Sequence, residues 1–415
     1  NFLNYTRSFG KHNATLMLGT SYSQSRSYGV SGSKKGYNED TTDMWGNVIN
    51  RVSHLGFLQN DPNFFYFAYA TSDAVKDVSG GEPTYTRKLS YFGRLNYDYA
   101  GKYMAQFSLR ADAADLSVLP KNKRWGYFPA VSLGWVLSEE NFMKGTEDWL
   151  SQLKLRASWG QNGSTASLGG YKWNVSIGAT GHLAVGDNNN FSYINGYAPS
   201  ATGNDGLKWE TSEQTNIGID ARFLDNRLSF TMDWYSKQTK DLLVEVGTNA
   251  ASGFATQYQN AGTVKNTGLE LSMGWRDQIG KEFKYGVNVN MAYNKNEVTE
   301  VNNANHFIEG GNDLLAQSTG RFVRMEEGHP IGYFYGYKTD GVIQNQNDLQ
   351  AYLDQNCKGN AANSKQGASI KPGDLKFVDV DGNGVINDDD KTDLGNPHPD
   401  VTMGLTLSAE YKGFD

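Results

Sequence analysis

The segment that decides the fold is Phe283-Lys284-Tyr285-Gly286-Val287-Asn288-Val289-Asn290-Met291-Ala292-Tyr293. Every second side chain in it is apolar or aromatic, and the residues between them are mostly polar or small. Because side chains along a β-strand point alternately to its two faces, this segment predicts a strand with one apolar and one polar face. We count about eleven such strands by this criterion. They span residues 1–9, 12–28, 86–99, 102–112, 128–138, 152–161, 208–223, 227–238, 264–276, 282–299 and 400–411.

The connections between these strands alternate between short and long. Tight turns occupy residues 10–11, 100–101, 225–226, 277–281 and 412–413, and a somewhat longer link covers 139–151. Long loops occupy residues 29–85, 113–127, 162–207, 239–263 and 300–399. All short links therefore fall at one end of the strands and all long loops at the other. Outer-membrane β-barrels have this arrangement, with short periplasmic turns and long extracellular loops.

The sequence thus predicts an all-β fold, a transmembrane antiparallel β-barrel. A soluble antiparallel sandwich also alternates, but its strands are usually about 5–6 residues long, and it has no reason to gather its long loops at one end. The aromatic content of 13%, with 24 Tyr and 9 Trp, suits the interfacial girdles of a barrel. The chain has no apolar run long enough for a helical span.

An odd number of strands does not close into such a barrel, and it leaves sheet edges whose backbone N–H and C=O groups would find no hydrogen-bond partner in lipid. We therefore expect the chain to supply only part of a larger barrel. The chain opens in a strand-like segment and closes in a turn-like one, so we expect it to be an internal piece of a longer protein.

Composition and motifs argue against several other functions. The net charge of -7 is mild and no basic patch stands out, so nucleic acid is not an expected partner. The six His residues show no metal-ligand spacing, and no Gly-x-Ser-x-Gly nucleophile motif occurs. The adjacent pair Glu139-Glu140 is best explained as a solvated turn. We predict no catalytic site, and a protein that is not an enzyme.

One segment has the residues and spacing of a metal-binding site. Residues 379–390 read DVDGNGVINDDD, which matches a twelve-residue calcium loop with glycine (Gly384) at its sixth position. The predicted Ca²⁺ ligands are Asp379, Asp381, Asn383, the Val385 carbonyl, Asn387 and Asp390. The alternative is a solvated turn rich in Asp, Asn and Gly, which forms readily without metal. Asp390 stands where an EF-hand usually has Glu, and flanking helices are not evident. We expect a structural ion that stiffens the extracellular loop at 300–399.

Two interpretations remain open for the aromatic runs in the long loops, which are residues 64–69 (FFYFAY) and 333–337 (YFYGY). Exposed aromatic rows suit the stacking of a sugar or peptide, or a partner surface. Short strands packed inside the loop layer are the other interpretation.

Several segments strongly resemble the SusC/RagA family of TonB-dependent outer-membrane transporters. They are residues 124–135 (RWGYFPAVSLGW), 138–143 (SEENFM), 153–163 (LKLRASWGQNG), 207–211 (LKWET), 235–243 (YSKQTKDLL) and 260–270 (NAGTVKNTGLE). The 379–390 loop followed by Leu394-Gly395-Asn396-Pro397 fits the same pattern. One departure lies at residues 110–117 (RADAADLS), where the family usually has Arg-x-Asp-Gly-Ser-Ser-Arg-Phe. The external end of that hairpin is therefore expected to differ in shape.

The resemblance implies a barrel of roughly 22 strands in the outer membrane of Bacteroidetes, with residues 1–415 in its C-terminal portion. It also implies a plug domain and a TonB box that this chain lacks. A SusD-like surface lipoprotein is the implied lid, and a dimer of transporter–lipoprotein pairs is a further expectation. The implied activity is TonB-powered import of a glycan or peptide, in contact with membrane lipid. The alternatives are a passive porin or surface-binding barrel without energy coupling and, with less support, an outer-membrane enzyme.

Overall fold

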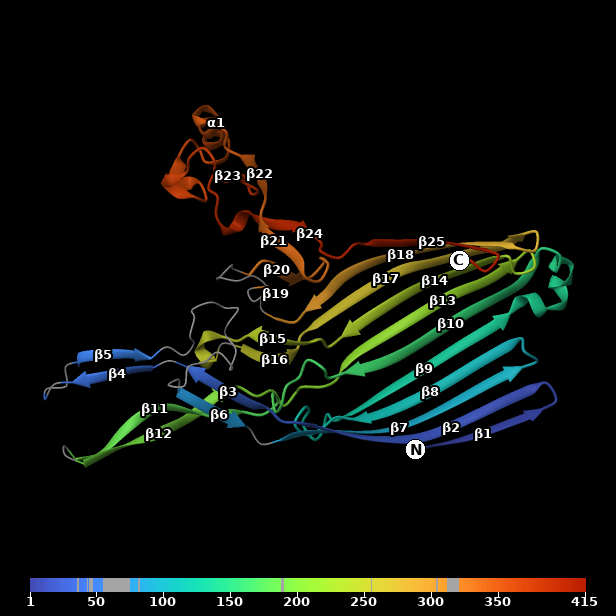
Figure 1. Cartoon of the computed structure of the whole chain (residues 1–415), viewed down its shortest axis with the longest axis horizontal. Helices are drawn as coiled ribbons and strands as arrows, with labels where there is room; N and C mark the ends of the chain where they lie inside the picture. Colours follow the sequence, from blue (N-terminus) through green and yellow to red (C-terminus); the bar gives the residue numbers. More distant parts are fainter. Residues whose placement is uncertain are drawn as a thin grey trace. The chain divides into compact units, whose positions relative to one another are not determined.

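The computed structural model describes residues 1–415 apart from 36, 43, 45–47, 55–74, 81–82, 188–189, 255, 304 and 312–320. Eleven long strands form one antiparallel sheet, ordered as they follow in the chain (Figure 1). They are β1 (Phe2–Phe9), β2 (His12–Ser27), β7 (Thr84–Tyr99), β8 (Tyr103–Ala113), β9 (Trp125–Val136), β10 (Leu150–Ser164), β13 (Glu210–Phe223), β14 (Leu228–Lys240), β17 (Gly262–Ile279), β18 (Phe283–Val301) and β25 (Val401–Tyr411). Every predicted strand is confirmed, with ends that shift by a few residues.

The register of the sheet places apolar residues opposite apolar residues on neighbouring strands. Met291 of β18 lies opposite Leu271 of β17 on one side and Met403 of β25 on the other. A slip of one residue would move every apolar side chain to the polar face, so this pairing is strongly specified. The predicted alternation at 283–293 therefore continues across its neighbours as one apolar surface.

The apolar face is exposed. Leu133 in β9 and Ile217 in β13 expose 56% and 54% of their surface although both lie on central strands. A water-soluble sheet would bury such a face, whereas a membrane-spanning barrel turns it toward lipid. Among the described residues, no helix has the length and apolar character needed to cross a membrane.

Aromatic rings gather near both ends of the strands. At the tight-turn end, Tyr103 stacks between Tyr99 and Trp135 with both centroid distances at 6.2 Å. At the loop end, Tyr91 stacks on Trp125 at 6.1 Å. The two Trp residues of β9 stand ten positions apart, which corresponds to about 33 Å along the strand and, at the tilt of barrel strands, to a height of about 25 Å. This matches the apolar band between two interfacial girdles.

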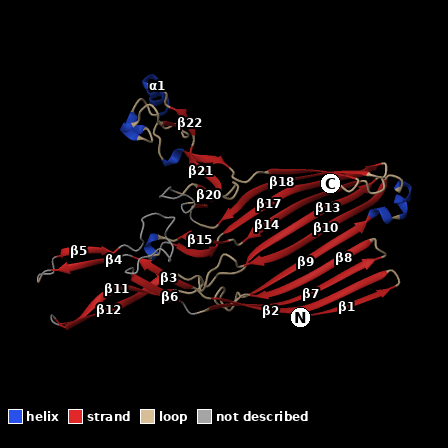
Figure 2. Ribbon diagram, in the orientation of Figure 1, coloured by secondary structure: helices blue, strands red, loops and turns tan. Residues whose placement is uncertain are grey.

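The loops expected at 162–207 and 239–263 each contain a hairpin. Strand β11 (Ser176–Asp187) pairs with β12 (Asn190–Ala201), and β15 (Leu243–Gly247) pairs with β16 (Thr256–Asn260). Helical turns η3 (Leu137–Glu139), η4 (Asn141–Thr146) and η5 (Ala250–Ser252) lie in the connections (Figure 2).

Residues 22–88 form a compact unit distinct from residues 1–21 with 89–415. In that unit, β3 (Val30–Lys35) pairs with β6 (Val75–Gly80), and β4 (Tyr37–Thr42) pairs with β5 (Val48–His54). The aromatic run at 64–69 lies outside the described residues.

The long loop before β25 is a small folded module, which we call the loop module (residues 321–395). Its elements are β20 (Val323–Glu326), β21 (Tyr333–Tyr337), β22 (Thr339–Val342), α1 (Gln346–Asn356), η6 (Ala361–Asn363), η7 (Gly367–Ser369), β23 (Leu375–Phe377), η8 (Asp388–Asp390) and β24 (Lys391–Gly395). Strand β19 (Phe307–Gly310) precedes it and pairs with β20. The Asn345 side chain caps α1. The buried core of the loop module consists of Ile343, Leu349, Tyr352, Leu353, Cys357, Ile370 and Ile386. Met325 packs with Val298 and Val301, which joins the module to the end of β18.

Candidate functional site

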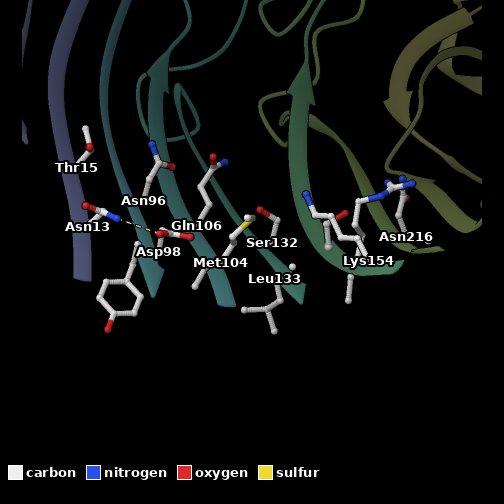
Figure 3. A pocket seen from close by; sticks show the side chains of 17 residues that line it. Asn13, Thr15, Asn96, Asp98, Met104, Gln106, Ser132, Leu133, Lys154 and Asn216 are labelled. Atoms are coloured by element: carbon white, nitrogen blue, oxygen red, sulfur yellow. Dashed lines mark hydrogen bonds between the residues drawn. The ribbon is translucent and has the colours of Figure 1, made fainter. Parts of the chain in front are cut away.

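The polar face of the sheet presents amide, hydroxyl and charged side chains from neighbouring strands. They line an open hollow of about 540 Å³ and include Asn13, Asn96, Gln106, Ser132, Lys154 and Asn216. Figure 3 shows Ser132 on one side of the ribbon and Leu133 on the other, as the alternation requires. Asn13 Nδ2 donates to Asp98 Oδ1 at 3.1 Å across two strands. This face is suited to contact with water and polar solutes.

Arg156 is the centre of an ion network on the same face. Its Nε and Nη2 donate to the two oxygens of Asp220 at 2.7 and 3.0 Å, and Nη2 also donates to Asp233 Oδ2 at 3.0 Å. These three residues come from β10, β13 and β14, so the network ties three strands together. Bidentate guanidinium–carboxylate pairs are geometrically specific and stronger than single contacts. One cation and two carboxylates leave a net negative charge at this point of the wall.

Lys154 lies two residues before Arg156 on the same face. Its register partner on β13 is Asp220, which already accepts from Arg156. Within the described part of the chain, no ion pair or hydrogen bond is assigned to the Lys154 ammonium. It is therefore the cation of this hollow best placed to meet an incoming polar group.

Gly218 makes room for the Arg156 network. A Cβ atom there would lie 2.3 Å from Asp233 Oδ1 and 2.8 Å from Arg156 Nη2. We expect Gly218→Ala to break the Arg156–Asp233 contact and to destabilise the barrel by about 1 kcal/mol, since both side chains are partly exposed and the pair is partly screened. Urea titration of heat-modifiable gel mobility measures the change.

Gly134 provides the matched control. It lies on the same face, but a Cβ there would meet Lys154 Cε at 3.4 Å, an ordinary contact with a flexible chain. Gly134→Ala should leave the midpoint unchanged. Equal midpoints for both variants would show that the network adds nothing to stability.

The predicted calcium loop is a tight turn held by its own acidic side chains. Asp379 Oδ2 accepts from Gly384 N at 2.7 Å, and Asp381 Oδ1 accepts from Asn383 N at 2.9 Å. Gly384 has a φ of +73°, the left-handed conformation that glycine adopts without strain. The loop follows strand β23, ends in the turn η8 and is followed by β24, with no flanking EF-hand helices among the described residues.

Asp390 closes this turn from inside the module. Its side chain is fully buried, and it accepts from Val380 N through Oδ1 and from Asn387 N through Oδ2, both at 2.8 Å. The carboxylates of Asp379, Asp381 and Asp390 offer oxygens within 4.8 Å of one another. Oxygen donors converging in this way fit a hard divalent cation.

The other three predicted ligands are placed differently. Asn383 Oδ1 accepts from Val385 N at 2.7 Å, and Asn387 Oδ1 accepts from Asp389 N at 2.7 Å. Val385 is half-buried. The structure thus brings the three aspartates together, while the two asparagine oxygens hold the backbone of the turn.

The aromatic run at 333–337 packs within the loop module. Tyr333 exposes 1% of its surface, and its hydroxyl donates to Glu326. The Arg324 guanidinium lies 3.3 Å from the Tyr335 ring centroid. Tyr337 donates to Asp388 Oδ1, a hydrogen bond that lowers the pKa of the Asp388 carboxyl. The interpretation as packed strands therefore holds for this run, and only Phe334 is substantially exposed.

Comparison with known proteins agrees with the barrel geometry. Residues 1–363 match the family model described as TonB dependent receptor-like, beta-barrel. This chain belongs to the TonB-dependent receptor β-barrel family. It is therefore part of an outer-membrane protein, and the soluble sandwich is excluded.

Two curated relatives show how far the similarity extends. TonB-dependent receptor P3 of Formosa agariphila is 32% identical over 100% of this chain and 37% of its own length. TonB-dependent receptor SusC of Bacteroides thetaiotaomicron is 32% identical over 79% of this chain and 30% of its own. The chain thus spans less than two fifths of either relative, and the resemblance to the SusC/RagA family is confirmed.

A solved structure shows the same fold. The RagAB peptide transporter aligns with a TM-score of 0.69 at 23% identity, over 99% of this chain and 39% of that one. The receptor-barrel wall described here is thus found in a protein whose sequence has diverged widely.

Sequence reasoning missed the Arg156 network. Arg156, Asp220 and Asp233 all occupy polar positions of alternating strands, which is the only signal that each carries. Their meeting depends on the register of three strands, and alternation excludes a slip of one residue but does not distinguish registers that differ by two.

Proposed function

We propose that this chain forms part of the wall of an active importer that takes up a glycan or peptide nutrient across the outer membrane. The observation that supports this most is the pairing of a lipid-facing apolar surface with a polar inner face whose charges are held in place around Arg156. A polar inner face provides a lumen for a hydrated cargo. Membership of the TonB-dependent receptor family supports energy coupling over a passive pore.

The proposed importer has two kinds of protein partner. TonB would supply the energy, and a plug domain with its TonB-contacting segment would have to come from outside these 415 residues. A SusD-like lipoprotein would cover the extracellular loops, which include the loop module. SusC and the RagAB peptide transporter, both similar to this chain, support this arrangement.

Uptake measurements separate the importer from its alternatives. Cells that carry the protein are given fluorescent oligosaccharides or a fluorescent casein digest, with TonB present or depleted. The importer predicts uptake that is lost on TonB depletion. Uptake that survives depletion would establish a passive porin, and surface binding without uptake would establish a surface-binding barrel. In a mild-detergent pull-down, repeated recovery of the barrel alone would contradict the lipoprotein lid.

We also propose that the 379–390 loop binds one structural Ca²⁺. The convergence of Asp379, Asp381 and buried Asp390 supports the site, with Asn383, Asn387 and the Val385 carbonyl as the remaining ligands. The ion would supply positive charge among three carboxylates and hold the turn against the core through Ile386. An isolated loop at an extracellular face suits weak binding, at about 10⁻⁴–10⁻³ M.

Protease sensitivity tests the calcium proposal. We expect Asp379→Ala with Asp381→Ala to increase cleavage within the loop module, and EGTA to have the same effect on the unaltered protein. Asp389→Ala is the matched control, because the Asp389 side chain is exposed and lies at a position that contributes no ligand. Identical cleavage in all four samples would refute the site.

A further inference from the structure

The lipid-facing surface of the sheet contains an apolar groove of about 640 Å³ near the tight-turn end. It follows a cross-strand row in which side chains alternate between large and small: Tyr97, Ala105, Leu133, Ala157 and Ile217. Tyr103 and Trp135 line its side nearest the turns. The two alanines leave depressions between larger neighbours. The volume lies in the range typical of small-molecule sites, about 300–1,000 Å³.

A polar surface formed by Lys102, Glu139 and Glu140, which we call the polar ledge, adjoins this groove beyond the aromatic girdle. Tyr103 Oη and Trp135 Nε1 both donate to Glu140 Oε1, at 2.6 and 3.1 Å. These hydrogen bonds, with that of Tyr103 the largest influence, lower the pKa of the Glu140 carboxyl, so it is ionised at neutral pH. The two aromatic side chains that border the groove thus point their polar atoms at a fixed anion.

The ledge also carries a cation. Lys102 Nζ lies 3.7 Å from Glu140 Oε2 and donates to the Glu139 carbonyl. An ammonium has three donors, so two remain after the carbonyl contact. Glu140 Oε2 has only this long contact within the described residues. A cation and an anion with spare hydrogen-bonding capacity therefore stand side by side where the groove meets the membrane interface.

We propose that the groove and its ledge bind one phospholipid whose headgroup carries a phosphate and a primary ammonium, as in phosphatidylethanolamine. An acyl chain would fill the depressions at Ala105 and Ala157. The lipid phosphate would accept from Lys102 Nζ, and the lipid ammonium would donate to Glu140 Oε2. Charge complementarity favours this zwitterionic lipid over an anionic one, and the apolar lining faces the hydrocarbon of the bilayer.

Native mass spectrometry of the protein extracted from its membrane and delipidated tests the assignment. The probes are palmitoyl-oleoyl phosphatidylethanolamine and the phosphatidylglycerol with the same chains. We expect the ethanolamine lipid to form the first adduct with roughly tenfold higher affinity, because only its headgroup carries an ammonium that can pair with the Glu140 carboxylate, whereas the glycerol headgroup offers neutral hydroxyls. Equal affinities, or no adduct, would overturn the assignment. So would a mass showing two copies of the protein in place of lipid, since a second copy would then cover the groove.

Variants test the two parts of the site separately. Ala157→Trp should fill the groove and abolish the first adduct, whereas Ala409→Trp, at an exposed outward position of β25, should not. Glu140→Gln should retain an adduct but lose the preference for the ethanolamine headgroup. Heat-modifiable gel mobility reports whether each variant is folded. Should Ala157→Trp fail to fold, Glu140→Gln decides alone, and a preference that survives it would refute the proposed headgroup contact.

Discussion

Replacing Val131 by arginine should destabilise the folded barrel by about 2–4 kcal/mol. Val131 lies on the apolar face of β9, opposite Phe107 of β8 and Trp159 of β10. It stands between the girdle residues Trp125 and Trp135, which places it close to the middle of the apolar band. An arginine there must place its charge in hydrocarbon or distort the bilayer to reach water, and the cost is highest near the midplane. Urea titration of folding into lipid vesicles measures the difference.

The next residue along the strand provides the control. Ser132 points to the polar face, where its register partners are Gln106 and Ser158. Ser132→Arg adds the same charge one position away but leaves it in the hydrated hollow of the polar face. We therefore expect it to lower the free energy of unfolding much less than Val131→Arg does. If the two variants unfold at the same urea concentration, the apolar face does not contact lipid.

Replacing Asp390 by alanine should open the loop module while the long sheet stays intact. The buried carboxylate is the acceptor for the backbone N–H groups of Val380 and Asn387. Alanine leaves both donors without their partner, and hydrogen bonds to a charged group contribute about 1.5–3 kcal/mol each. We therefore expect a local loss of about 3 kcal/mol or more. Hydrogen exchange of the α1 amides in the presence of EGTA measures it without any contribution from calcium.

Asp389→Ala again serves as the control, because that side chain is exposed beside the buried one. Its α1 amides should exchange at the rate of the unaltered protein. Slow exchange retained in Asp390→Ala would show that the turn does not depend on the Asp390 carboxylate. Fast exchange throughout β17 and β18 would show that the module and the sheet unfold together.

The long strands could be predicted because each carries its own alternation over many residues, as 283–293 does. The loop hairpins could not, because β15 offers only five residues of pattern and β11, although it has twelve, is interrupted by an irregularity between Thr180 and His182. Helix α1 did have a signal, since Leu349, Tyr352 and Leu353 follow helical spacing after the N-cap Asn345. The signal is weak, because only three of the eleven residues of α1 are buried apolar or aromatic side chains and most of the others are polar.

The site residues divide in the same way. The convergence of Asp379, Asp381 and Asp390 follows from spacing within one short turn, so it could be predicted. Arg156 with its two aspartates, and the groove at Ala105 and Ala157, depend on which residues of separate strands lie opposite one another. Such contacts are set by hydrogen-bond register across the sheet, which a single strand does not encode.

Spin-label accessibility along β9 tests the central claim most directly. Single cysteines at residues 127–135, in a Cys357→Ser background, are labelled in the protein reconstituted into lipid nanodiscs. We expect oxygen, which partitions into lipid, to collide most with labels at the odd positions, such as Val131 and Leu133. A water-soluble nickel chelate should collide most with labels at the even positions, such as Ser132. Nickel accessibility that is equally high at odd and even positions would contradict a lipid-facing wall.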